Sequence, residues 1–397
     1  MVVQLCSDRF AEYSSMRQYR RVLSVAKEIY CLSSNPFSQA AWHRSSDRLS
    51  ITCISFRFIL SSLYNSSSLQ KLALCRLKVV AAHQQLILSI PTLRTLIMQF
   101  SEFIPTSVAL PPSFITTLNL GEQEQAATRY TLTLVANSLE TLELSSVMYH
   151  LLADIPLPRL TSLKSPSIPE TMAFFSSLSA LTNLTISIIG DFRLDIDIDP
   201  TVLPNLHYLC TWWTLGALLI AGRPVRIFRL PGQFTVPGDP LTRLAGYVSH
   251  LAAAASQLEE LQLPLEIPIC ETVELLTEYF PHITRLYLWT WGGEIPAPHL
   301  DMRSVKRNKG QHPSLKEVII AFSPKHQNRG AYLLWRSPEW VLPRAECETM
   351  FEMIVKKCAV VEVVRIGVSF SIDEKEVPRE WVMEMRKAKD GRWVERN

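Results

Sequence analysis

The chain has 397 residues, of which 47% are hydrophobic and 19% charged, and its formal net charge is +3 at pH 7. This apolar content excludes a disordered chain, and the near-neutral charge excludes a basic field directed at nucleic acid. The eight cysteines form no C-x-x-C pair and do not cluster with histidines at zinc-ligand spacing, so we expect reduced thiols in a cytoplasmic or nuclear protein.

The N-terminal segment, residues 1–48, shows no apolar signal-peptide region. Within it, MRQYRRVLSVAKEIYCL (16–32) has the apolar spacing of a helix, which predicts a helical cap on the first repeat. No run reaches the roughly 18 apolar residues of a membrane span, and the longest candidate, LGALLIAG (215–222), is too short.

A short apolar motif, L-x-x-L-x-L, recurs along the rest of the chain. The first seven steps between copies are 19–25 residues long, and later steps are 33, 25, 32 and 46 residues. Leucine-rich repeats have a period of about 20–29 residues. A degenerate unit near Leu49 would open the array. With Ile, Val, Phe or Met allowed at the apolar places, twelve copies begin at Leu69, Leu93, Ile115, Leu139, Leu160, Leu181, Leu206, Val225, Leu258, Ile283, Leu315 and Val361.

We therefore expect an α/β leucine-rich-repeat solenoid of horseshoe form over residues 49–370, with helical caps. If each unit is numbered from the first residue of its motif, alternation buries positions 4 and 6 of a short strand, and position 1 enters the core from the preceding turn. Positions 3, 5 and 7 then line the concave face of a parallel sheet, and irregular helices or 3₁₀ turns return the chain on the convex side. The place three residues after position 6 holds no Asn in the first seven units, so no Asn ladder is expected.

Three longer stretches interrupt the array, at about 230–250, 291–314 and 323–346. The first contains a Pro/Gly loop (230–244), and the second carries a basic cluster (303–309) that we interpret as an exposed loop. Beyond them, ECETMFEMIVKKC (346–358) and PREWVMEMRKAKDG (378–391) are predicted helices, and residues 371–397 are predicted to form a C-terminal capping helix.

Catalytic motifs are missing from the sequence. It contains no G-x-S-x-G, Walker A, G-x-G-x-x-G or H-E-x-x-H. The acidic run DIDIDP (195–200) lacks the Gly and terminal Glu of a calcium loop and is typical of a strand with one wet face. We expect a non-enzymatic protein with no catalytic residue, cofactor or metal.

Large aromatic and arginine side chains gather at positions 3, 5 and 7 of the later units. These residue types are enriched in binding hot spots, which predicts a protein partner on the concave face. The alternative is that the inserted stretches fold back and cover this patch. The candidate partner-binding residues are Tyr208, Trp212, Arg229, Arg285, Tyr287 and Trp289.

The units LQKLAL, LETLEL, LTNLTI, LEELQL and ITRLYL, with lead-ins such as IPTLRTL (90–96), resemble the leucine-rich-repeat region of fungal F-box proteins. That resemblance covers about residues 49–370. It implies a substrate-recognition subunit of a cullin-type ubiquitin ligase, whose F-box holds the ligase adaptor.

The F-box itself is not visible, because residues 1–45 lack its Leu-Pro-x-Glu start. RVLSVAKEIYCLS (21–33) would be the back half of a decayed one, so residues 1–48 are either a helical cap or an F-box-like remnant. The alternative function is a stand-alone scaffold or inhibitor that binds a protein on the same face. Neither function involves nucleic acid or a membrane.

Overall fold

The computed structural model describes residues 2–6, 28–32, 69–75, 77–121, 123–145, 154–166, 173–186, 198–231, 240–264, 268–291, 310–323, 343–368 and 380–396. The chain divides into two compact units. Unit 1 comprises Met1–Ile188 and Thr201–Asn205, and unit 2 comprises Ile189–Pro200 and Leu206–Asn397.

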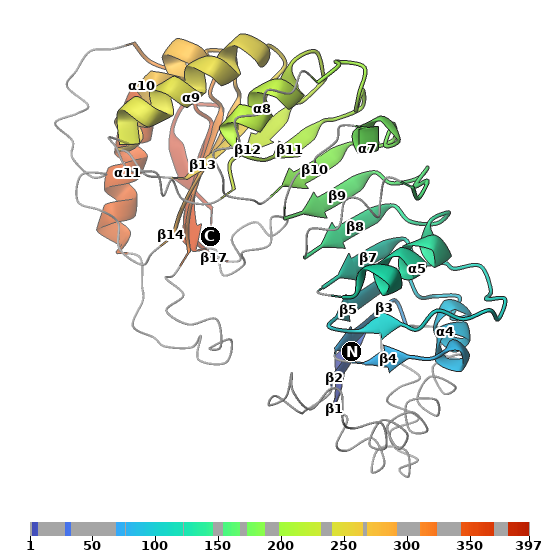
Figure 1. The fold of residues 1–397 in the computed structure, drawn as a ribbon. Helices are drawn as coiled ribbons and strands as arrows, with labels where there is room; N and C mark the ends of the chain where they lie inside the picture. The colour runs from blue at the N-terminus through green and yellow to red at the C-terminus, as the bar shows by residue number, and fades with distance from the viewer. Residues whose placement is uncertain are drawn as a thin grey trace. The chain divides into compact units, whose positions relative to one another are not determined.

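In unit 1, neighbouring strands pair in parallel in chain order, and a small ribbon of β4 (Lys78–Val79) and β6 (Glu102–Phe103) lies outside the main sheet (Figure 1). Among the described residues, these strands are connected by helices α4 (Ala81–Leu88) and α5 (Gln125–Val135) and the short α7 (Ala173–Ser176). The paired strands are β1 (Val2–Cys6), β2 (Glu28–Leu32), β3 (Lys71–Cys75), β5 (Thr95–Gln99), β7 (Thr117–Leu120), β8 (Thr141–Leu144), β9 (Ser162–Ser165) and β10 (Asn183–Ile186).

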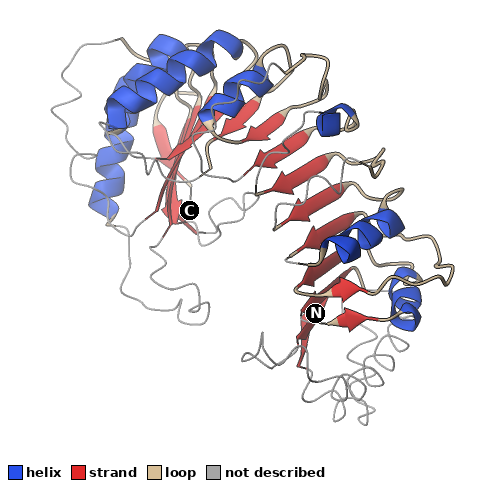
Figure 2. Cartoon of the chain, viewed as in Figure 1, coloured by secondary structure: helices blue, strands red, loops and turns tan. Residues whose placement is uncertain are grey.

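In unit 2, the parallel order continues from β11 to β16, and two antiparallel strands follow. Helices α8 (Trp213–Ile220), α9 (Pro240–Ala254), α10 (Ile269–Tyr279) and α11 (Arg344–Lys357) cover one side of the strands (Figure 2). The strands are β11 (Tyr208–Cys210), β12 (Ile227–Arg229), β13 (Glu260–Pro264), β14 (Arg285–Trp291), β15 (Glu317–Ser323), β16 (Val363–Val368), β17 (Glu380–Lys387) and β18 (Trp393–Glu395).

The predicted repeat is confirmed strand by strand. Each of the twelve motif copies places its third residue at the first residue of a strand, from Lys71 in β3 to Val363 in β16. Position 1 is at most 2% exposed in every copy, and position 4 at most 1%. No single unit could bury its own three apolar side chains, so burial comes from stacking on neighbouring units. The fold is a leucine-rich-repeat solenoid.

Backbone hydrogen bonds join each unit to the one before it. The carbonyl oxygen of Gln70, at position 2, accepts from the N–H groups of both Arg94 and Thr95 in the next unit. The same forked bond recurs in the rest of both units, for example from Thr284 and Arg285 to Glu259. This pairing places position 3 of successive units side by side, which sets the register of the open sheet face.

No Asn ladder was expected from the sequence, and at one site a serine hydroxyl accepts the backbone hydrogen bond that such a ladder would accept. Ser101, 1% exposed, accepts a hydrogen bond on its Oγ from the N–H of Leu77 in the preceding unit at 2.9 Å. Buried backbone N–H groups are costly to leave unpaired, so the short hydroxyl does at this site what an Asn amide does in regular repeats. Nearby, Gln84 is fully buried and donates to the carbonyl oxygens of Val79 and Ile104.

The interruptions of the array are more structured than predicted. The stretch at 230–250 is not a loop throughout, since α9 begins at Pro240, where a missing N–H costs a helix nothing. The predicted helix at 346–358 is confirmed as α11. The basic cluster at 303–309, most of 323–346 and the unit near Leu49 lie outside the described residues.

One glycine lets a helix approach the sheet. A Cβ built on Gly216 of α8 would lie 2.6 Å from the ring of Phe228 in β12, a fully buried side chain. Trp213, one turn earlier, also meets Phe228, with ring centroids 5.8 Å apart. The close seating of α8 on β12 therefore depends on the missing side chain at 216.

Two predictions for the chain ends are wrong over the residues that the structure describes, and residues 16–27 and 371–379 lie outside them. Residues 28–32 of the predicted N-terminal helix form β2, because Ile29 and Cys31 alternate as Leu72 and Leu74 do and pair with them in register. The predicted C-terminal capping helix is instead the antiparallel pair β17–β18. Antiparallel pairing of β17 with β16 places Met383 opposite Ile366 and Glu384 opposite Arg365, and it satisfies the backbone edge that the last parallel strand would expose.

Among the described helices, none combines the length and apolar character needed to cross a membrane.

Candidate functional site

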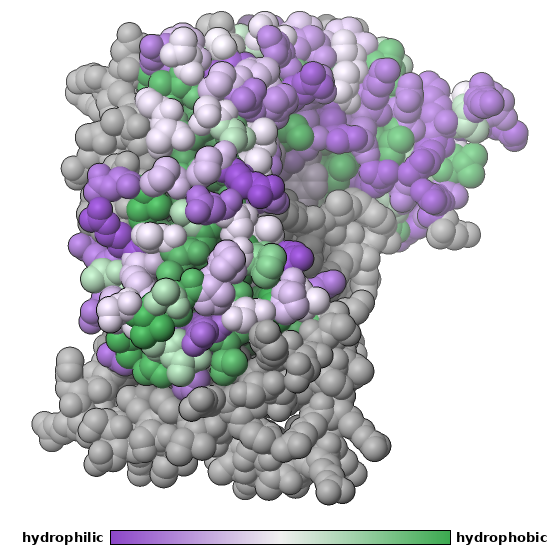
Figure 3. All heavy atoms as spheres, turned by 90° about the vertical axis from the view of Figure 1, so that its right-hand side faces the viewer, coloured by the Kyte–Doolittle hydropathy of each residue, from purple (hydrophilic) through white to green (hydrophobic). Residues whose placement is uncertain are grey.

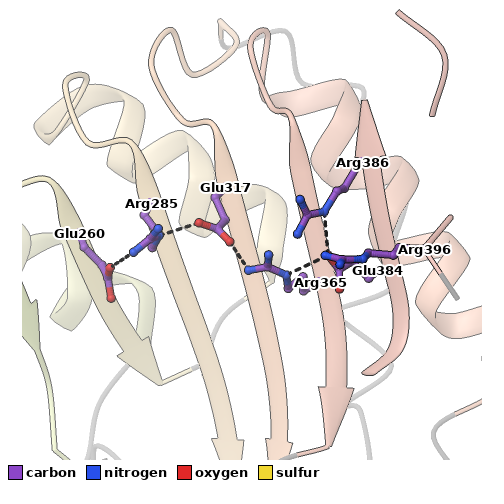
Figure 4. A network of polar contacts seen from close by, with 7 residues as sticks. All are labelled: Glu260, Arg285, Glu317, Arg365, Glu384, Arg386 and Arg396. Atoms are coloured by element: carbon purple, nitrogen blue, oxygen red, sulfur yellow. Dashed lines mark hydrogen bonds and ion pairs between the residues drawn. The ribbon is translucent and has the colours of Figure 1, made fainter. Parts of the chain in front are cut away.

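The face of unit 2 opposite the helices carries an extended network of ion pairs. We call it the open face: positions 3, 5 and 7 of the β11–β16 units, together with the β17 residues beside them. In Figure 4 its side chains stand in front of the strands, with the helices behind. Register puts position 3 residues in one rung (Glu260, Arg285, Glu317) and position 5 residues in the next (Gln262, Tyr287, Ile319).

Alternating charges cross five strands of this face. Arg285 donates from Nη1 to Glu260 Oε2 at 2.9 Å and from Nε to Glu317 Oε2 at 2.6 Å. Arg365, opposite Ile319 in register, reaches diagonally to Glu317 and also approaches Glu384, with Nε to Oε1 at 3.4 Å. We call the set the charged row: Glu260, Arg285, Glu317, Arg365, Glu384, Arg386 and Arg396 (Figure 4).

Two groups of the row, Arg285 and Glu384, have pKa values shifted in the direction that favours their charged forms. Hydrogen bonds that Arg285 donates to Glu260 and Glu317 raise the pKa of its guanidinium, against the opposing effect of burial. Burial acts to raise the pKa of Glu384, but the hydrogen bond from Arg386 and the charge of Arg365 outweigh it and leave that pKa lowered. Arg285 nevertheless remains 50% exposed, so its guanidinium is oriented and still accessible.

The aromatic residues of β14 lie differently from each other. Tyr287 is half-buried, and desolvation raises the pKa of its hydroxyl, partly offset by the charge of Arg229. Trp289 is only 6% exposed, and the guanidinium carbon of Arg229 lies 5.9 Å from its ring centroid. Trp289 is therefore buried, with a cation–π contact from two strands away. The inserted stretches that were expected as an alternative to cover the patch lie largely outside the described residues.

The remaining predicted site residues come from β11. Tyr208 is half-buried at position 3 of the strand, and Trp212 is a half-buried residue at the N-cap of α8. The indole Nε1 of Trp212 is buried without a hydrogen-bond partner in the described part of the chain. The structure thus brings Arg229, Tyr287 and Trp289 together, places Arg285 beside them on β14, and leaves Trp212 at the end of its strand.

Sequence reasoning missed most of the charged row. The signal was present in part, because Glu260, Arg285 and Glu317 occupy position 3 of three successive units. Arg365 occupies position 5 of the last unit, and Glu384 and Arg386 lie in the segment predicted to be helical. A search of position 3 alone could not have connected Arg365, Glu384 and Arg386 with the other residues of the charged row.

Unit 1 has a smaller polar chain on the corresponding positions. Asn119 donates to Glu143 at 2.7 Å, and Lys164 forms an ion pair with the same carboxylate at 3.0 Å. Exposed apolar side chains also occur in this unit, including Phe100, Val108 and Phe114, and Figure 3 shows hydrophobic and hydrophilic residues interspersed over the visible face. Within the described ranges, no group of three or more His, Cys, Asp or Glu side chains could hold a metal ion.

Comparison with known proteins yields structural neighbours alone. No family model matches the chain, and no curated protein matches it. Among solved structures, it is similar to TLR13 in a complex with ssRNA13, at a TM-score of 0.40 and 16% identity, over 67% of this chain and 41% of that one. It is also similar to the leucine-rich-repeat protein LegL7 from Legionella pneumophila, at a TM-score of 0.38 and 12% identity, over 99% and 92% of the two chains.

The chain thus spans under half the length of the TLR13 chain. The fold assignment rests on the strand pairing and burial of this chain's own repeats.

Proposed function

We propose that the chain is a non-enzymatic protein-binding repeat protein whose partner sits on the open face of unit 2. The observation that supports this most directly is Arg285. Its guanidinium is half exposed, yet two carboxylates on the flanking strands fix its orientation. A side chain held in place before binding loses less conformational entropy on binding, which favours affinity.

The surroundings of Arg285 fit the same role. Tyr287, two residues along β14, offers a half-buried ring with its hydroxyl. Two residues further along, the buried Trp289 has the guanidinium of Arg229 over its ring. Tyr, Trp and Arg are the residue types that dominate binding hot spots. Trp289 is too buried to serve as the direct contact, so Arg285 and Tyr287 are the residues we assign to the partner.

The test compares two variants of the full chain as bait in native-cell extract, with mass spectrometry. Arg285→Gln/Tyr287→Ala removes the proposed contact. Glu317 retains its ion pair with Arg365, and Glu260 retains its hydrogen bond from Gln262, so we expect the sheet of this variant to fold. Arg226→Gln is the matched control, because Arg226 forms a similar exposed pair with Glu259 at 3.7 Å just before β12.

A partner retained by the wild type and the control but lost from the double variant, then reproduced with purified proteins, is the expected result. Loss from both variants, or retention by both, would refute binding at this face. Circular dichroism on each variant checks that folding is unchanged.

We propose further that the partner is a substrate delivered to a cullin-type ubiquitin ligase, a role supported by the resemblance of the repeats to fungal F-box proteins. The segment 21–33, predicted as the back half of a decayed F-box, contributes residues 28–32 to the sheet as β2. This strand, found where the remnant of an F-box was expected, favours the alternative function of a stand-alone binder. Recovery of a ligase adaptor with both the wild type and the open-face variant would favour the ligase role, and recovery with neither would favour the stand-alone binder.

A further inference from the structure

The charged row is balanced at one end and unbalanced at the other. Arg285 lies between Glu260 and Glu317, and Arg365 lies between Glu317 and Glu384. At the β17 end, however, three arginines share one carboxylate. The row as a whole has three glutamates and four arginines, so its surplus positive charge is concentrated at Glu384.

The two outer arginines of that end are oriented but poorly neutralised. Arg386 Nε donates to Glu384 Oε1 at 2.8 Å, and Arg396 Nη1 lies 3.8 Å from the same oxygen. Their side chains are 44% and 63% exposed, whereas that of Glu384 is 10% exposed. In the described ranges, Glu384 is the one carboxylate within ion-pair distance of either arginine.

Other arginines near the C-terminal strands have their own carboxylates. Arg344 forms a two-pronged pair with Glu395, at 2.7 and 2.6 Å, and also meets Glu348. Arg392 pairs with Asp390 at 2.6 Å. Among the described arginines near these strands, Arg386 and Arg396 are thus the two that share a carboxylate with a third arginine. They lie on the same face as Arg285 because Glu384 is opposite Arg365 in register.

From this arrangement we infer that Arg386 and Arg396 bind acidic side chains of a protein partner, with Glu384 orienting the guanidinium groups. This inference rests on the proposed protein-binding function of the open face and specifies the partner as an acidic segment that extends from Arg285 towards β17. A guanidinium offers five N–H donors in a planar fork that matches a carboxylate. Arg386 commits Nε to Glu384, which leaves its two terminal nitrogens for the partner.

The probe for the test is a fluorescein-labelled deca-glutamate peptide, with deca-glutamine as the uncharged control, followed by fluorescence anisotropy at low ionic strength. The variant Arg386→Gln/Arg396→Gln removes the proposed site. The matched control, Arg129→Gln/Arg392→Gln, removes the same net charge from two exposed arginines that each have a carboxylate partner at 3.2 and 2.6 Å.

We expect saturable binding of deca-glutamate by the wild type and the control, and binding roughly tenfold weaker in the Arg386/Arg396 variant, which corresponds to about 1.4 kcal/mol. Equal weakening in both variants would overturn the inference, because it would show attraction to net charge alone. Failure of the wild type to bind deca-glutamate would also overturn it.

A labelled oligouridylate serves as a second probe. Binding of this RNA through the same two arginines, without binding of deca-glutamate, would replace the acidic segment with a nucleic acid. The proposed function is tested separately by the Arg285/Tyr287 variant. If that variant loses a protein partner while deca-glutamate does not bind, the open face is an interface and the acidic partner is wrong.

Discussion

Lys357 of α11 and Glu274 of α10 form a buried ion pair that should make unit 2 sensitive to the loss of either charge. Nζ and Oε1 are 2.5 Å apart, and the side chains are 5% and 12% exposed. Removing one partner leaves a charge with little access to water, which costs about 3–5 kcal/mol in comparable buried pairs. Lys357→Met and Glu274→Leu should each lower the free energy of unfolding by that amount. The double variant should lose far less than the sum, since it leaves no uncompensated charge.

Urea unfolding followed by tryptophan fluorescence measures this in the right part of the chain. Eight of the nine tryptophans belong to unit 2, so the signal reports on the unit that contains the pair. Circular dichroism of the whole chain gives an independent baseline. Single variants that each cost under about 1 kcal/mol, the value typical of exposed pairs, would refute the reasoning, and so would a double variant whose cost equals the sum of the two.

Three further predictions concern packing, pH and thiol chemistry. Gly216→Ala should destabilise unit 2 by roughly 1–3 kcal/mol, because the added Cβ meets the Phe228 ring. Gly246→Ala in α9, where a Cβ meets nothing within 4 Å, should instead stabilise unit 2 by about 0.5–1 kcal/mol. Urea midpoints that rank the two variants in the opposite order would contradict this prediction. Burial lowers the pKa of His312, whose Nδ1 accepts a hydrogen bond from the Leu315 N–H. The unfolded chain therefore binds a proton more readily than the folded chain, and stability should fall as pH drops below the ordinary pKa of about 6.5. His312→Asn should lack this dependence of stability on pH, and an unchanged dependence would assign it to another group. Burial raises the pKa of the Cys358 thiol to about 12, so a thiol reagent should modify Cys358 only after the chain unfolds. Mass spectrometry of the labelled peptides would show this. Labelling of Cys358 in the native protein would contradict its burial.

The repeat could be predicted because its determinants are local. Leu139, Leu142 and Leu144 must be apolar for a unit to bury them, and the same spacing recurs wherever a strand stacks on the last one. The ends could not be predicted in this way. β2 has Ala26 where other units have a large apolar residue, and Val382 with Met385 in β17 also fits a helical spacing.

The site was harder to predict than the fold, because it depends on pairings between units. Trp289 is of a residue type typical of exposed binding anchors. It is nevertheless buried, and its contact with Arg229 comes from a residue that is remote in sequence and two strands away. Arg285 was identified from its residue type, and the two glutamates that orient it become visible only in the register of three strands.

The forked backbone bond from position 2 of one unit to positions 2 and 3 of the next has a consequence for how such a chain can change over generations. The bond is the same where successive motifs are 24 residues apart, at Gln70 and Thr95, and where they are 46 apart, at Lys316 and Val363. The connecting segment can therefore gain or lose residues while the strands keep their alignment. Insertions can alter the outside of the molecule, and substitutions on the strands can alter the binding face, with little interference between the two.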